Sequence, residues 1–366
     1  MKFSIEREDF LRPLQTVIGA VERKQTMPVL GNLLLEASES ALTITASDSE
    51  IELTSTIQVS VDQPGSITVP ARKLVDICRS LTEQSRIDVE LSNEQLKVKS
   101  GRARFSLSTM AANLFPRTDP LEDSQSIEIE QTVLAQALRA TAFSMAQQDV
   151  RFYLNGLLIE ISEERLCCVA TDGHRLAYSE CATAAIPEEP IRAIVPRKTV
   201  LELTRLLDPE QGGALVALSK NFLQITMGDT VLTSKLIDGT FPDYNRVIPI
   251  DGNKELLLDR ESLRGTLQRA AILSSEKYRG VRLAIDNKVL TVSSNNPERE
   301  EAVDELEIDY AGDGAEIGFN VNYLLDVLNA IDTDNARMLL KDSNSSALVM
   351  PETADTTKYV IMPMRL

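Results

Sequence analysis

The chain has 366 residues and a formal net charge of −17; 43% of the residues are hydrophobic, 4% are aromatic and none is Trp. This length favours two or three domains, whose cores must be built mainly from aliphatic side chains. A net charge this negative repels nucleic acid at long range. Contact with DNA or RNA would therefore need a locally basic surface.

The sequence also argues against a membrane or secreted protein. No apolar run approaches the roughly 18 residues that cross a bilayer, and the charged residues 1–9 contain no apolar core of a secretory signal. Of the four cysteines, Cys167 and Cys168 are adjacent in a predicted strand and therefore point to opposite faces. We expect reduced, buried thiols and no metal or cofactor, in a soluble cytoplasmic protein.

The first elements follow the order strand, helix, strand pair, helix. Residues 3–6 predict a strand, and apolar side chains at helical spacing predict a helix from about Arg7 to Val21. Residues 32–36 and 42–45 predict paired strands. A second helix follows Pro70 and runs over 72–81, with proline at the head of the helix, where no N–H partner is needed.

The same order then recurs twice. Strands at 127–130 and 256–259 are each followed by a helix, and second helices are predicted at 198–207 and 321–331. A strand marker, Leu42–Asp48, recurs as Leu166–Asp172 and Leu290–Asn296, with spacings of 172 − 48 = 124 and 296 − 172 = 124. We therefore predict three copies of one α+β domain, over 1–122, 123–250 and 251–366.

Asp172-Gly173-His174-Arg175 contains the only histidine of the chain. One interpretation makes His174 a general base oriented by Asp172, as in a hydrolase. No recognisable Ser or Cys nucleophile accompanies it, and the matching positions of the other copies lack His. A plain surface turn and a binding site therefore remain the favoured alternatives.

Basic residues recur at the start of the second helices of an otherwise acidic chain. They form either a solvated helix face or a surface that contacts phosphates without reading bases. Residues near the first helix of the first and third copies extend the pattern. The set is Arg72, Lys73, Arg79, Arg197, Lys198 and Arg205, with Arg7, Arg12, Arg23, Lys24, Arg264 and Arg269.

Two further segments stand out. Residues 359–366 stay apolar to the end, which indicates either a last edge strand or a Met-rich platform for several partners. Acidic residues gather at 298–305, whereas Arg102 and Arg104 precede Phe105 and Leu107. Opposite charges in the last and first copies favour head-to-tail association, which closes into a ring if the rotation allows.

The repeat, Thr171–Leu176 and Met362–Leu366 together resemble the bacterial DNA polymerase III beta subunit family, the sliding clamps, over the whole chain. Asp149–Gly156, Phe241–Tyr244 and Gly318–Val321 carry the same resemblance. It implies three clamp domains, each with two helices packed on two antiparallel sheets, and a ring-shaped homodimer of six domains with helices lining the hole. It implies a processivity factor without catalytic activity.

The resemblance also implies partners and sites. The partners are encircled duplex DNA without sequence specificity, a second copy, the polymerase III catalytic subunit, the clamp loader, and other polymerases and repair proteins with clamp-binding peptides. The implied DNA contacts are Lys24, Arg72, Gln148, Phe152, Tyr153, Arg197 and Lys198, where Lys24 and Phe152 replace the Arg and Tyr expected of the family. The implied peptide cleft comprises Leu154, Thr171, Gly173, His174, Arg175, Leu176, Pro242, Arg246, Val247, Val360, Met362, Pro363, Met364, Arg365 and Leu366. The implied dimer seam joins Lys73, Arg102, Arg104, Phe105 and Leu107 to Ile272, Leu273, Glu298, Glu300, Glu301 and Asp304.

Overall fold

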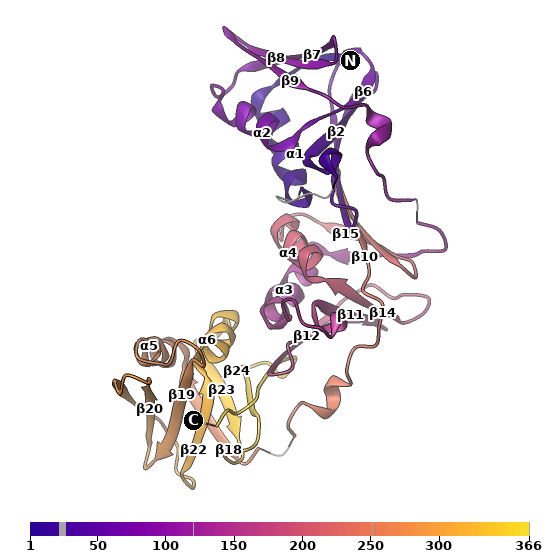
Figure 1. Cartoon of the computed structure of the whole chain (residues 1–366). Coiled ribbons are helices and arrows are strands. Elements are labelled where there is room, and N and C mark those ends of the chain that lie inside the picture. Colours follow the sequence, from indigo (N-terminus) through magenta and orange to yellow (C-terminus); the bar gives the residue numbers. More distant parts are fainter. Residues whose placement is uncertain (22–26, 120, 251, 366) are drawn as a thin grey trace. The chain divides into compact units, whose positions relative to one another are not determined.

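The structure is a computed structural model that describes residues 1–21, 27–119, 121–250 and 252–365 (Figure 1). Its described residues form two compact units. The first unit contains Met1–Gln131 and Arg205–Leu236, and the second contains Thr132–Thr204 and Ile237–Leu366. Each unit is described separately below.

Each predicted copy contains two α-helices, as the sequence indicates. Their bounds are α1 Arg7–Val17, α2 Ala71–Ser80, α3 Gln131–Thr141, α4 Arg197–Leu206, α5 Arg260–Ala271 and α6 Val321–Ala330. The second helices begin and end within one residue of the prediction because their apolar spacing is regular. Helix α2, for example, buries Ala71, Leu74, Val75 and Cys78 along one face.

Two details of the helix ends differ from the prediction. Helix α1 stops at Val17 and continues only as a 3₁₀ turn over Ile18–Ala20; the poor helix propensity of Gly19 fits this early end. Pro70 is the last residue of its strand and the N-cap of α2 rather than its first helical residue. A missing N–H is tolerated at the N-cap as well as at the first helical residue.

The first unit contains two antiparallel sheets. One has the strand order β5-β1-β7-β8-β9, and the other has the order β10-β15-β16-β17-β4-β3-β2-β6. Their bounds are β1 Lys2–Glu6, β2 Asn32–Ala37, β3 Ala41–Ser47, β4 Ile51–Gln58, β5 Val61–Gln63, β6 Gly65–Pro70, β7 Arg86–Ser92, β8 Gln95–Ser100, β9 Ala103–Ser108, β10 Gln125–Glu130, β15 Gly213–Leu218, β16 Phe222–Met227 and β17 Thr230–Lys235.

The second unit also contains two antiparallel sheets, with the orders β14-β11-β12-β13-β25-β24-β23-β18 and β21-β20-β19-β22. Their bounds are β11 Gly156–Ser162, β12 Arg165–Thr171, β13 Arg175–Ala182, β14 Ile191–Pro196, β18 Lys254–Asp259, β19 Gly280–Asp286, β20 Val289–Asn295, β21 Glu301–Glu307, β22 Ala315–Asn320, β23 Asn335–Leu340, β24 Ala347–Pro351 and β25 Thr357–Ile361. The α+β prediction with antiparallel sheets is confirmed.

Both eight-stranded sheets are composite, because each joins strands of two successive copies. In the first unit β4 pairs with β17, with Glu52 opposite Thr233. In the second unit β13 pairs with β25, with Leu176 opposite Val360. The marker segments of the sequence are the strands β3, β12 and β20, each of which pairs with β4, β13 or β21 in turn. Each eight-stranded sheet is therefore continuous from one copy to the next.

The thiols are unoxidised, as the sequence predicts. All four cysteines are free; Cys78, Cys167 and Cys168 are buried, whereas Cys181 is only partly covered. Burial raises the pKa of Cys78 to about 12 and that of Cys167 to about 11. No helix within the described residues is long and apolar enough to span a bilayer.

Candidate functional site

A cavity of about 190 Å³ in the second unit collects most of the residues that the family resemblance assigns to a peptide cleft. Its walls come from the turn between β12 and β13, the 3₁₀ turn Phe152–Leu154, the segment 241–247 and the end of β25. Nine expected residues line it: Leu154, Thr171, Gly173, Arg175, Leu176, Pro242, Val247, Val360 and Met362. Most of this lining is apolar, which suits apolar peptide side chains.

The turn at Asp172 shapes one wall of the cavity. One carboxylate oxygen of Asp172 accepts hydrogen bonds from the backbone N–H groups of His174 (2.9 Å) and Arg175 (3.0 Å), and the other accepts from Arg175 Nε (3.1 Å). Gly173 has φ +89°, and a Cβ there would lie 2.9 Å from Nη2 of Arg151. The turn therefore requires glycine at this position.

This geometry does not support the hydrolase alternative. The imidazole of His174 is exposed, and no hydrogen bond joins it to Asp172 in the described part of the chain. Because both carboxylate oxygens hold the turn, Asp172 does not orient the imidazole as a general base requires.

Arg175 connects this wall to the rest of the second unit. Its guanidinium donates to Asp326 of α6 (2.6 Å) and to the carbonyl of Phe143 (2.7 Å). It also lies over the ring of Tyr323, 4.5 Å from the centroid. A half-buried charge with this many partners is positioned firmly, so Arg175 shapes the cavity more than it offers free hydrogen-bonding groups.

Other residues of the expected cleft lie beside the cavity rather than in its lining. His174 and Arg246 are exposed, and Met364 and Arg365 line a separate hollow of about 370 Å³ with Tyr278 and Asn295. The chain end is tied down by backbone bonds, because Met362 N donates to His174 O and Met364 N donates to Gly318 O. Pro363 lies between these two bonds, and Leu366 lies outside the described residues.

Four lining residues were not predicted for the cleft: Arg151, Tyr153, Phe241 and Tyr244. Arg151 binds Asp149 through its side chain and holds the pKa of that carboxyl at about 2. Burial raises the pKa of Tyr244, and so does the hydrogen bond that its hydroxyl donates to Glu160 at 2.6 Å. The motif Phe241–Tyr244 contains two of them and the motif Asp149–Gly156 contains the other two, so the sequence marked both segments without assigning these residues to the cleft.

The basic residues fall into two groups. Arg7 donates to the carbonyl oxygens of Cys78 and Arg79, while Arg264 and Arg269 pair with Glu261 and Asp304. These three cations are therefore already engaged within the chain. Arg72 and Lys73 are exposed at the start of α2 and have no ion pair with any described residue.

The other residues expected to contact DNA lie in the second unit. Gln148 has a positive φ and Phe152 is 74% exposed, whereas Tyr153 lines the cavity. Arg197 and Lys198 begin α4, and Arg197 donates to the carbonyl of Met145. Lys24 lies outside the described residues.

The residues expected at the dimer seam lie on two sheet edges. β9 is the edge of the five-stranded sheet and β21 is the edge of the four-stranded sheet. Arg102 and Arg104 are exposed at the first edge, and Glu298, Glu300 and Glu301 are exposed at or just before the second. Phe105 is partly buried and Leu107 is buried; Ile272, at the end of α5, is 75% exposed, and Leu273 beside it is partly buried. Asp304 pairs with Arg269 within the chain, at 2.6 Å.

Comparisons with known proteins agree with this arrangement. Profiles of the DNA polymerase III beta subunit match the chain in order: the N-terminal domain over residues 1–119, the central domain over 128–243 and the C-terminal domain over 245–365. The chain belongs to the DNA polymerase III beta subunit family.

Full-length relatives support the same assignment. The chain is 48% identical to the beta sliding clamp of Pseudomonas putida and 46% identical to that of Escherichia coli K12, with all of each chain covered. A crystal structure of the Pseudomonas aeruginosa DNA polymerase sliding clamp matches with a TM-score of 0.96 at 48% identity and full coverage of both chains. In this chain the N-terminal, central and C-terminal domains of the family follow one another.

Proposed function

We propose that this beta subunit is a sliding clamp, a processivity factor that encircles duplex DNA and tethers the replicative polymerase, with no catalytic step of its own. The observation that carries the proposal is the full-length match to beta sliding clamps, with all three domains in order. The arrangement of Asp172, whose carboxylate holds a turn, agrees with a role in binding rather than hydrolysis.

The repeat supplies an argument for a ring. Each internal junction pairs the strand that follows a marker strand, β4 or β13, with the last strand of the next copy, β17 or β25. The corresponding strands with one unpaired edge in the described chain are β21 of the third copy and β9 of the first. A second chain can satisfy both edges by the same pairing, head to tail, so that two chains close a ring of six domains.

Repeat equivalence also predicts the register of this seam. Glu52 and Glu301 match because their partners Ser47 and Asn295 hold equivalent marker positions. Ser106 matches Thr233 because Gly101 and Gly228, both with positive φ, each lie two residues before the strands β9 and β17. Since Glu52 lies opposite Thr233, Ser106 should lie opposite the partner copy's residue 301.

The charges at the two edges fit that register. It places Arg102 opposite Glu305, and Arg104 opposite Val303 between the diagonal neighbours Glu301 and Glu305. Opposite charges at such positions stabilise a strand pair. On the other face Phe105 would reach the end of α5, where Ile272 is exposed. Lys73, Leu107, Leu273, Glu298, Glu300 and Asp304 belong to the same proposed seam.

The proposed mechanism is topological. A closed ring stays on duplex DNA however weak its contacts are, so the lining needs only mobile, sequence-independent contacts to phosphate. Arg72, Arg197 and Lys198 at helix starts are suited to this, and the acidic remainder of the chain discourages DNA from binding elsewhere. Lys24, Gln148, Phe152 and Tyr153 remain proposed contacts.

The cavity of the second unit is the proposed docking site for short peptides of the polymerase, the clamp loader and repair proteins. Its apolar lining and its Met362 suit apolar anchors from several partners. The solved clamps of P. aeruginosa and Bartonella birtlesii were crystallised bound to griselimycin, which supports a ligand-binding surface in this family. Cytoplasmic location and the boundaries 1–122, 123–250 and 251–366 are parts of the same proposal.

A retention experiment tests the ring. After loading onto nicked circular DNA by the loader of its own replication system, the protein should stay on the circle through gel filtration and leave once the circle is linearised. Equal retention on the two DNAs would refute encirclement. The His174→Ala variant should still be retained on circles while binding a polymerase-derived peptide more weakly.

A further inference from the structure

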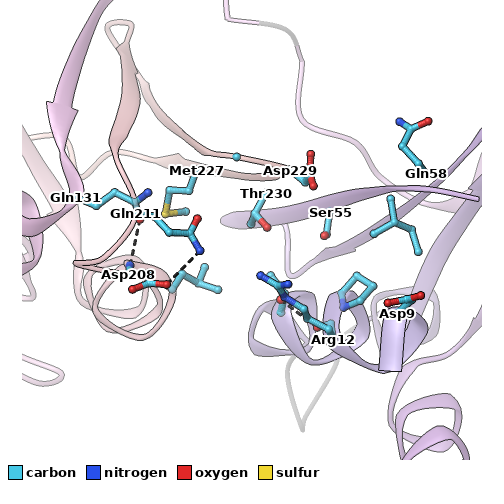
Figure 2. A pocket seen from close by; sticks show the side chains of 15 residues that line it. Asp9, Arg12, Ser55, Gln58, Gln131, Asp208, Gln211, Met227, Asp229 and Thr230 are labelled. Atoms are coloured by element: carbon cyan, nitrogen blue, oxygen red, sulfur yellow. Dashed lines mark hydrogen bonds between the residues drawn. The ribbon is translucent and has the colours of Figure 1, made fainter. Parts of the chain in front are cut away.

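A second polar hollow, of about 570 Å³, lies in the first unit and is separate from the proposed peptide cleft. Its walls are α1, β4, the turn between β16 and β17, the first residue of α3, and the end of α4 with the residues that follow it (Figure 2). Ser55 and Thr230, which face one another across the β4–β17 pair, form part of its lining. The hollow therefore lies at the junction of the first two copies.

Two nearly buried polar side chains in its lining each have a hydrogen-bonding group without a partner among the described residues. Gln131 is only 3% exposed; its Oε1 accepts from Asp208 N at 3.1 Å, which leaves its amide nitrogen as an open donor. Ser55 is 5% exposed, and its hydroxyl has no hydrogen bond to any described residue. Buried polar groups are nearly always hydrogen-bonded, so these two groups point to a ligand or ordered solvent in the hollow.

The charged residues of the lining narrow the kind of ligand. Three carboxylates, Asp9, Asp208 and Asp229, line the hollow together with one guanidinium, Arg12. Asp208 is already satisfied by Glu210 N and by the amide of Gln211. Asp9, Asp229 and Arg12 have no ion pair in the described chain, so the hollow offers two open anionic groups beside one open cation.

A ligand that satisfies all of these groups must carry both an anionic acceptor and a cationic donor. A simple polyamine has no acceptor for the amide of Gln131 or for Arg12, and a simple phosphate has no donor for Asp9 and Asp229. An amino acid with a basic side chain has both, and its methylene groups can contact the apolar lining residues Pro13, Ile57 and Met227. The volume accommodates a peptide end of one or two residues.

We propose that this hollow binds the carboxyl end of a peptide that terminates in arginine or lysine. The α-carboxylate accepts from the amide of Gln131 and from Arg12, and the basic side chain lies between Asp9 and Asp229. The site is independent of the ring and of the apolar cleft. A ligand there would contact two successive domain copies at once.

Calorimetric titration of the full-length protein with the dipeptide glycyl-arginine tests the site. Saturable binding on the order of millimolar is expected for so small a ligand. Gln131→Glu keeps the acceptor for Asp208 N but replaces the open donor by a second acceptor, so binding should fall about tenfold or more. Asp229→Asn should weaken binding about fivefold, and the C-terminal amide of the dipeptide should bind more weakly than the acid.

The control variant is Asp62→Asn, which removes an exposed carboxylate outside the hollow and should bind like the unmodified protein. Circular dichroism establishes that each variant is folded. The proposal is overturned if glycyl-arginine gives no saturable heat, if glycyl-glutamate binds equally well, or if the Gln131 and Asp229 variants bind like the control. Retention on circular DNA does not depend on any of these outcomes.

Discussion

Ile272→Ala tests the proposed seam most directly, because this side chain is 75% exposed in the single chain and should become buried in the dimer. The substitution removes three carbon atoms, worth about 0.8 kcal/mol each when buried, or roughly 2.4 kcal/mol in all. Only the 75% of the side chain that is exposed can become newly buried in the dimer, so the expected loss of binding free energy is about 1.8 kcal/mol for each seam.

A head-to-tail dimer contains two identical seams, so the loss counts twice. The free energy of dimerisation should therefore weaken by about 3.6 kcal/mol, which raises the dimer dissociation constant about 400-fold. The folded single chain should be nearly unaffected, because an exposed side chain contributes little to its stability.

Sedimentation or single-particle mass measurements across a dilution series give the dissociation constant. Ile250→Ala is a matched control, since Ile250 is 96% exposed and lies outside the proposed seam. Equal dissociation constants for the two variants would refute the proposed position of the seam. A tighter dimer for Ile272→Ala would contradict the burial argument as well.

Three further predictions concern the cleft, the DNA contacts and the thiols. Gly173→Ala should lower the free energy of unfolding in urea by about 1–3 kcal/mol, because φ is +89° and the new Cβ meets Arg151. It should also weaken binding of a polymerase-derived peptide. Unchanged unfolding and binding would contradict the requirement for glycine. Replacing Arg72 and Arg197 by Gln should reduce the slope of log K against log salt for duplex DNA by about 1.8, and an unchanged slope would remove them from the lining. Iodoacetamide at pH 8 should modify Cys181 first, because burial raises the pKa of Cys78 to about 12 and of Cys167 to about 11, which keeps both thiols protonated. Mass spectrometry showing Cys78 modified first would contradict this order.

The helices and strands of the repeat are predicted well from the sequence, because the same apolar pattern occurs in each of the three copies. The apolar spacing of α2, α4 and α6 and the markers on β3, β12 and β20 are local signals. The end of α1 was predicted too late, because apolar spacing continues through Ile18 while Gly19 weakens the helix.

The cavity of the second unit is harder to predict from the sequence, because residues that lie far apart in the chain form it through tertiary contacts. Tyr244 reaches the cavity beside Glu160, which is 84 positions away in the chain. Arg269 and Asp304 were expected in different surfaces, yet they bind each other. Charge patterns alone do not show which cations are already neutralised, so the basic set of the sequence was larger than the set that remains unpaired.

The composite sheets have a consequence for how such a ring would open. At β4–β17 and β13–β25 the two strands belong to one chain, so strands that separate stay tethered to each other and can pair again without a second molecule. The proposed pairing of β9 with β21 joins two chains and would have no such tether, so the fraction of chains that are paired would depend on protein concentration. A ring of two chains would contain four such strand pairs within chains and two between chains. Dilution would therefore separate the ring only at the two pairs between chains.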